Sequence, residues 1–171
     1  MNRENFRAMK SGLFLAVLIA VVLACSRSPG LPKGIDPAKL QSVQAQVDFN
    51  VEVPRYLPLG LRLVGAEVLP LAIPDSGKET HISFFAYPDG PGLQFSQSQS
   101  QGQFELAMSD QPYKPVTVRG TPGFLYTDPY REGRTSLSLV WNRGDMAYNL
   151  WGFLERGLTR EMFLKIAESV Q

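Results

Sequence analysis

Apolar and polar residues alternate along much of the chain between residues 49 and 150. The alternating segments are Phe49–Val53, Leu61–Leu71, Glu79–Tyr87, Leu93–Ser98, Val116–Arg119, Phe124–Tyr126, Leu137–Trp141 and Met146–Leu150. A period of two residues places successive side chains on opposite faces of a strand. Stretches rich in Gly, Pro, Asn and Asp interrupt the pattern at residues 89–92, 120–123 and 142–145, where turns are expected. The pattern predicts about seven strands joined in antiparallel hairpins.

Two amphipathic helices are expected to flank the strands. The first should begin at Pro37, after Asp36 as its N-cap, and run for about ten residues. Its apolar stripe comprises Leu40, Val43 and Val47, and that of the last helix, capped by Thr159, comprises Phe163, Ile166, Ala167 and Val170. Helices this short need a surface to pack on. The predicted class is α+β: a single antiparallel sheet of about seven strands with an N-terminal and a C-terminal amphipathic helix packed on it, over residues 36–171.

The first 25 residues have the pattern of an export signal. Arg3, Arg7 and Lys10 precede an apolar run from Leu13 to Ala24. As a helix this run would span about 18 Å, which is too short for a bilayer core of about 30 Å. A positive region followed by a short apolar run is typical of a secretory signal peptide.

The segment from Val22 to Cys25 resembles the bacterial lipobox, an aliphatic residue and two small or apolar residues before an obligatory cysteine. The resemblance implies that residues 1–24 are removed and that Cys25 is the lipid attachment site. Residues 25–35, rich in turn and breaker residues, would form a flexible tether. The alternative is a buried, inert Cys25 in an uncleaved signal anchor. We expect an exported protein, lipid-anchored at the outer face of the cell membrane or in the periplasm, with the outer membrane as a further destination where the host has one.

The composition argues against several classes of partner, metal site and activity. The formal net charge is +1 and there are no basic blocks, so nucleic acid is not an expected partner. One Cys and one His cannot build an internal disulfide or a zinc site made only of His and Cys ligands. No Gly-rich phosphate loop or catalytic motif occurs, so neither a cofactor nor an enzymatic activity is expected.

His81 offers the only catalytic alternative that the pattern suggests. It shares a predicted strand face with Ser83, and a base beside a hydroxyl is the raw material of nucleophilic catalysis. Neighbours on the same face of any strand are arranged in this way. A partly exposed strand histidine is therefore the preferred interpretation, and a hydrolase centred on His81 the weaker one.

Aromatic residues are the more informative feature. Trp141 lies in register with the apolar positions of its strand and is expected in the core. Trp151 and Phe153 follow the opposite parity from Leu150, so they either meet a helix or form an exposed strip for a ligand or partner. Tyr56, between two prolines, either caps the core or contacts a partner. These three residues are the candidate contacts for an envelope protein or an apolar ligand.

The order of several motifs resembles an uncharacterised bacterial envelope domain. They are Phe49-x-Val-x-Val-Pro-x-Tyr-Leu-Pro-x-Gly60, Val116-x-Val-x-Gly120, Leu139-x-Trp141-x-x-x-Gly-Asp-x-Ala-Tyr148-x-Leu, Gly157-Leu-Thr159 and Ile166-Ala-Glu-Ser169. This domain-of-unknown-function family occurs in predicted lipoproteins and beside anti-sigma-factor-like segments. It is distantly similar to the sheet domains of periplasmic sigma regulators and lipoprotein carriers. The resemblance implies a small α+β domain and brings no catalytic residues.

The sequence thus predicts a membrane-anchored lipoprotein that acts as a non-enzymatic binding or sensing module. The alternative is a carrier or chaperone for an amphiphile or a lipoprotein, with acyl chains held between the sheet and a helix. An empty apolar cavity under the helix would favour the carrier, whereas a filled face would favour the binding module.

Cys25→Ser should abolish lipid transfer, because the thioether needs the thiol. The uncleaved precursor should accumulate, or the protein should leave the membrane fraction, as checked by mass spectrometry of the purified chain. An intact, unmodified Cys25 in the mature wild-type protein would contradict the lipid anchor.

Overall fold

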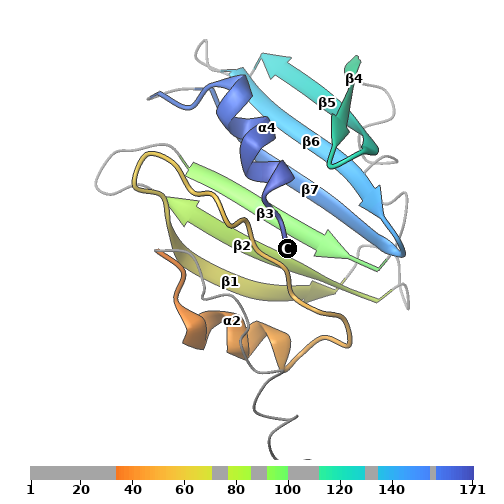
Figure 1. Cartoon of the computed structure of the whole chain (residues 1–171). Helices are drawn as coiled ribbons and strands as arrows, with labels where there is room; N and C mark the ends of the chain where they lie inside the picture. Colours follow the sequence, from red (N-terminus) through yellow and green to blue (C-terminus); the bar gives the residue numbers. More distant parts are fainter. Residues whose placement is uncertain (1–33, 71–76, 86–91, 100–111, 130–134, 155–156) are drawn as a thin grey trace, which may run out of the picture. The chain divides into compact units, whose positions relative to one another are not determined.

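Seven strands form one antiparallel sheet in the computed structural model, which describes all residues except 1–33, 71–76, 86–91, 100–111, 130–134 and 155–156 (Figure 1). The strands are β1 (Arg62–Pro70), β2 (Lys78–Phe85), β3 (Gly92–Ser98), β4 (Tyr113–Val118), β5 (Thr121–Pro129), β6 (Thr135–Arg143) and β7 (Met146–Phe153). Their spatial order is β1-β2-β3-β7-β6-β5-β4. With helices α2 (Pro37–Gln44) and α4 (Arg160–Glu168), this confirms the predicted α+β class. Cys25, the signal segment 1–24 and the tether up to residue 33 lie outside the described residues.

One face of the sheet, the core face, carries the apolar positions of the predicted alternation. The register places Phe95 opposite both Ile82 and Leu150, and Leu139 opposite both Leu150 and Leu125. Each of these five side chains is fully or almost fully buried. Trp141 and Tyr148 extend the row with stacked rings whose centroids lie 5.1 Å apart. Trp141 is therefore a core residue, as predicted.

Helix α4 packs on the core face, in front of the central strands in Figure 1. Thr159 is its N-cap, since its hydroxyl accepts a hydrogen bond from the Met162 N–H at 3.2 Å. Phe163, Ile166 and Ala167 are buried, as predicted. Gly152 of β7 permits the close approach: a Cβ there would lie 2.7 Å from Leu93 Cδ2 and 3.5 Å from Phe163 Cε2.

Helix α2 lies beside the edge strand β1 (Figure 1). Asp36 caps its N-terminus and Val43 is its buried residue. It ends at Gln44, so Val47, expected in its apolar stripe, lies beyond the helix and is buried from the following segment. Lys39 Nζ donates to the carbonyl of Val64 at 2.6 Å. The helix thus covers part of the sheet edge rather than the centre of the core face.

An irregular segment, residues 47–61, crosses the core face beside α4; we call it the strap (Figure 1). The strand predicted at Phe49–Val53 is wrong, because the described segment contains only an isolated bridge between Pro54 and Val170. Phe49 and Val53 are buried against the core. Their alternation therefore reflects burial under a crossing segment, not pairing within the sheet.

Two turns are tighter than the sequence predicted. The β4–β5 hairpin turns at Arg119 and Gly120, with φ of 51° and 82°, which is the pattern of a type I′ turn. Residues 122 and 123, expected in this turn, belong to β5. Between β6 and β7 only residues 144 and 145 form the turn, with a φ of 63° at Gly144. Arg143, expected in the loop, is therefore held at a strand end.

Phe163→Ala should lower the free energy of unfolding by about 3–5 kcal/mol, because the ring is fully enclosed between α4 and the sheet. Urea denaturation monitored by circular dichroism measures this loss. Glu168→Ala, at an exposed position of the same helix, is the matched control and should change stability by less than about 0.5 kcal/mol. Equal stability of the two variants would contradict the docking of α4.

Pro115 should protect the open edge of β4 from pairing with another chain. In a two-residue hairpin, Val118 and Thr121 form the closing hydrogen-bonded pair, so Pro115, three positions away, points its backbone nitrogen outward. Because proline lacks an N–H, it interrupts the outward row of donors. Pro115→Thr should restore the donor and promote concentration-dependent association in light scattering. A variant with the wild-type mass at every concentration would contradict this role.

Candidate functional site

The face of the sheet opposite α4, which we call the outer face, carries the candidate contacts Trp151 and Phe153. Both are half-buried, and their rings meet edge to face with centroids 4.9 Å apart. This burial lies between the two alternatives that the sequence left open, contact with a helix and an exposed strip. Phe85, on the same face, is 50% exposed, and its ring lies over Gly92, where a Cβ would come within 2.6 Å of it. We call Phe85, Trp151 and Phe153 the aromatic strip.

Polar side chains adjoin the strip. The register places Trp151 between Gln94 of β3 and Ser138 of β6. The Ser138 hydroxyl donates to Oδ1 of Asn149 at 2.8 Å. This hydrogen bond orients the Asn149 amide, which lies two residues before Trp151 on the same face of β7. Rings and amides thus share one surface in this corner of the outer face.

His81 lies on the same face, two strands away from Trp151. Its Nε2 lies 2.8 Å from Glu79 Oε1, and its Nδ1 is hydrogen-bonded to the amide of Gln94. A neutral ring with its proton on Nε2 satisfies both contacts, since Gln94 then donates to Nδ1 and Glu79 accepts. With both ring nitrogens engaged in this way, His81 is not arranged to activate the hydroxyl of Ser83.

Tyr56, the third candidate contact, lies on the strap and therefore on the other side of the sheet. It packs against the core, and its backbone N–H donates to Ser169 Oγ at 3.0 Å. Lys165 Nζ lies 4.5 Å from the centre of its ring, a cation–π contact. Tyr56 thus fastens the strap to α4, and the structure does not bring it together with Trp151 and Phe153.

A polar cluster that no sequence pattern indicated lies between the strap and the ends of β6 and β7. Glu52 of the strap forms an ion pair with Arg143 Nη2, and the Tyr148 hydroxyl donates to Glu52 Oε2 at 3.1 Å. Arg143 also donates to the Tyr148 oxygen at 3.2 Å and to the Val170 carbonyl at 3.3 Å. Arg143 and Tyr148 lie 91 and 96 positions after Glu52 in the chain, so no local pattern could have revealed their contact with Glu52.

The cluster shifts two pKa values. Burial raises the pKa of Tyr148, and the charge of Glu52 raises it further, against the opposing effect of Arg143. Burial alone would lower the pKa of Arg143, but the hydrogen bond to Tyr148 and the charge of Glu52 outweigh it and raise that pKa. Tyr148 therefore stays protonated and can donate a hydrogen bond, and Arg143 stays positively charged. Both side chains bind Glu52 and so hold the strap on the core face.

Residues 53–170 match the DUF4367 family, described as a domain of unknown function. This chain is a member of the DUF4367 family. None of the curated proteins compared with it matches. A crystal structure of a protein from Bacteroides thetaiotaomicron VPI-5482, at 1.50 Å resolution, is similar with a TM-score of 0.40 and 10% identity. The match covers 66% of this chain and 44% of that one, so it spans less than half of that protein's length.

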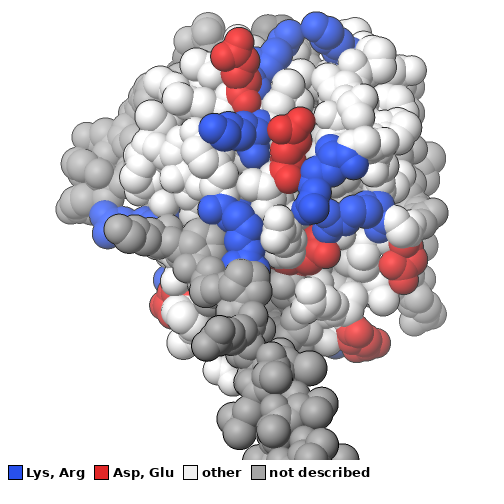
Figure 2. Space-filling model, viewed as in Figure 1, with Lys and Arg blue, Asp and Glu red and all other residues white. Residues whose placement is uncertain are grey.

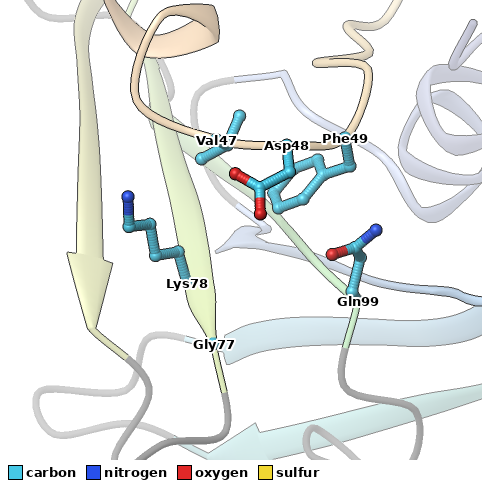
Figure 3. A pocket seen from close by; sticks show the side chains of 6 residues that line it. All are labelled: Val47, Asp48, Phe49, Gly77, Lys78 and Gln99. Atoms are coloured by element: carbon cyan, nitrogen blue, oxygen red, sulfur yellow. The ribbon is translucent and has the colours of Figure 1, made fainter.

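A small cavity in this DUF4367 protein lies between the start of the strap and the adjoining ends of β2 and β3 (Figure 3). It has a volume of about 150 Å³ and is lined by Val47, Asp48, Phe49, Gly77, Lys78 and Gln99. Lys78 Nζ is bound to the Gln46 carbonyl at 2.6 Å. The cavity has room for only a few heavy atoms, and it does not include the aromatic strip or His81.

Three further observations concern the surface charge, the hydropathy of the helices and the potential metal ligands. Basic and acidic side chains are interspersed over the α4 side of the DUF4367 domain, without a patch of one sign on the visible described surface (Figure 2). Within the part of the chain that the structure describes, no helix has the length and apolar character needed to cross a membrane. No group of three or more potential metal-ligating residues occurs among these described residues.

Raising the pH should destabilise the wild-type protein more than Tyr148→Phe. A raised pKa means that the folded state holds the phenol proton more tightly than the unfolded state does. The resulting stabilisation is complete below the unfolded pKa of about 10 and is lost as the pH rises from there through the folded value. Urea midpoints at about pH 8 and about pH 11 measure the difference. Equal losses in both proteins would contradict the shift, and Glu52→Gln should reduce the loss.

Proposed function

We propose that this protein is an exported, lipid-anchored, non-enzymatic binding module, tethered through Cys25, whose contact surface is the aromatic strip. The observation that carries the proposal is the contrast between the two faces of the sheet. On the core face Phe84, Phe95, Leu139 and Leu150 are fully buried under α4 and the strap. On the outer face, Tyr126, Val140 and Ala147 form a second buried cluster, whereas the rings of the aromatic strip keep solvent-exposed surface.

The carrier alternative is less well supported. A carrier for acyl chains needs apolar volume between the sheet and its cover, and among the described residues the buried side chains of Phe163 and Ile166 from α4 and of Val53 from the strap pack into that space. The cavity at residues 47–49 is only about 150 Å³ and has Asp48, Lys78 and Gln99 in its lining. An amphiphile would require the strap to leave the core face, against the ion pair and the backbone hydrogen bonds that hold it.

A non-enzymatic role is supported by the surroundings of His81. Its two ring nitrogens contact the carboxylate of Glu79 and the amide of Gln94. Neither contact places a hydroxyl or thiol where the ring could activate it as a nucleophile. The family resemblance contributes no catalytic residues. The export and anchoring parts of the proposal rest on the signal segment and on the cysteine at its end.

Trp151→Ala should weaken binding at least tenfold while it lowers the free energy of unfolding by only about 1–2 kcal/mol, because the ring is half-buried and loses mainly its contact with Phe153. Binding is measured by crosslinking the lipidated protein in envelopes of its own host. Thermal melts of the same variant measure stability.

Tyr113→Ala is the matched control, because Tyr113 is also exposed on the outer face but lies on the far edge strand β4. It should leave the crosslinked products unchanged. The proposed surface would be wrong if Trp151→Ala gave wild-type crosslinking. A loss of stability as large as the roughly 3–5 kcal/mol expected for Trp141→Ala would also remove Trp151 as a contact residue.

A further inference from the structure

Uncharged side chains surround Trp151 on the outer face. Its neighbours along β7 are Asn149 and Phe153, and its partners across the sheet are Gln94 and Ser138. The next positions in the register, outward from these four, are Ser83, Ser96, Ser136, Val140 and Tyr126. Beyond this ring of neighbours lie His81, which is hydrogen-bonded to Gln94, and its partner Glu79. A ligand that rests on Trp151 therefore meets apolar ring surface and neutral hydrogen-bonding groups.

The accessible polar groups are of one chemical kind. Ser96, Ser136 and Ser138 are buried, at 4–5% exposure, whereas Gln94, Asn149 and Ser83 are only half-buried. An amide offers both donors and acceptors, and a hydroxyl offers the same in smaller form. Because Asn149 accepts from Ser138 through Oδ1, its Nδ2 group is the part that can donate to a ligand.

Aromatic rings beside uncharged amides and hydroxyls favour some classes of ligand over others. A phosphorylated or carboxylated ligand would find no opposite charge among the described neighbours of Trp151; the exposed Arg62 lies opposite Phe85, at the other end of the strip. An acyl chain laid on the strip would remove water from the amide atoms of Gln94 and Asn149 that do not contact His81 or Ser138, without giving these atoms hydrogen-bond partners. A sugar ring matches both features, since its C–H face packs on an aromatic ring while its hydroxyls exchange hydrogen bonds with amides.

We propose that the aromatic strip, together with Gln94, Asn149 and Ser83, is a binding platform for a neutral glycan. The inference rests on the proposed function, because it names the ligand class of the same surface. Phe85 and Trp151 provide the stacking surfaces on either side of Gln94. Gly92, with the Phe85 ring over it, leaves the end of β3 without a protruding side chain between Phe85 and Phe153.

The test uses the full-length protein in a zwitterionic detergent that contains no sugar. The neutral probes are chitohexaose, cellohexaose and maltohexaose, followed by isothermal titration. At least one should bind saturably, with an affinity independent of salt because no charge is paired. Trp151→Ala should weaken binding at least tenfold, Trp151→Phe should retain part of it, and Tyr113→Ala should leave it unchanged. Gln94→Met, which keeps the length but removes the amide, should weaken binding as well.

Further outcomes separate this inference from the proposed function. If none of the neutral hexaoses binds while crosslinking in the envelope still depends on Trp151, the ligand class is wrong and the binding surface stands. If the strip binds the apolar dye N-phenyl-1-naphthylamine and no glycan, the site is one for amphiphiles. If neither glycans nor Trp151-dependent crosslinks are found, both proposals fail. Thermal melts of each variant distinguish lost contacts from lost folding, and Trp151→Phe provides a variant that keeps a ring in place.

Discussion

The backbone N–H and C=O groups of the strap cross an apolar surface, where they need hydrogen-bond partners. The closure of the core depends on the residues that provide these partners. A buried backbone group without a partner costs about 1–3 kcal/mol. Two glutamines supply the partners: Gln44 bridges the Phe49 carbonyl and the Val51 N–H, and Gln97 bridges the Asn50 carbonyl and the Glu52 N–H, all at 2.8–2.9 Å. Their amides replace the hydrogen bonds that a strand would have made.

Residues 169–171 also hold the strap, through backbone hydrogen bonds. Val53 and Gln171 exchange both of their backbone hydrogen bonds, and the Arg55 N–H donates to the Ser169 carbonyl. Arg119 and Arg143 both donate to the carbonyl of Val170. The strap, the end of α4 and the β-hairpin turns therefore form one connected polar layer above the core. This layer covers the core face, and the contact surface that we propose lies on the outer face, where Trp151 adjoins the amides of Gln94 and Asn149.

Much of the fold was predictable because strand periodicity and helix capping are local. The β2, β3, β6 and β7 strands and the N-cap at Thr159 follow from spacing within a few residues, as does the burial of Trp141. The same rule failed at residues 49–53, because alternation reports which side chains are buried and not what buries them. At Gln97 the rule gives the correct face, that of Leu93 and Phe95, but its polar side chain gave no sign that it would be fully buried there as a partner for the strap.

The sequence by itself determined the class of fold, the two capped helices, the apolar face of the sheet and the parity that separates Trp151 and Phe153 from the core. Only the tertiary structure decided that Tyr56 faces the core, that Phe85 joins Trp151 and Phe153, and that Glu52, Arg143 and Tyr148 meet. The faces of a strand or a helix follow from a period of 2 or 3.6 residues, and this period can be read directly from the sequence. Contacts between Glu52 and residues 91 and 96 positions away depend on strand order and on the path of the strap, which arise only when the whole sheet is assembled.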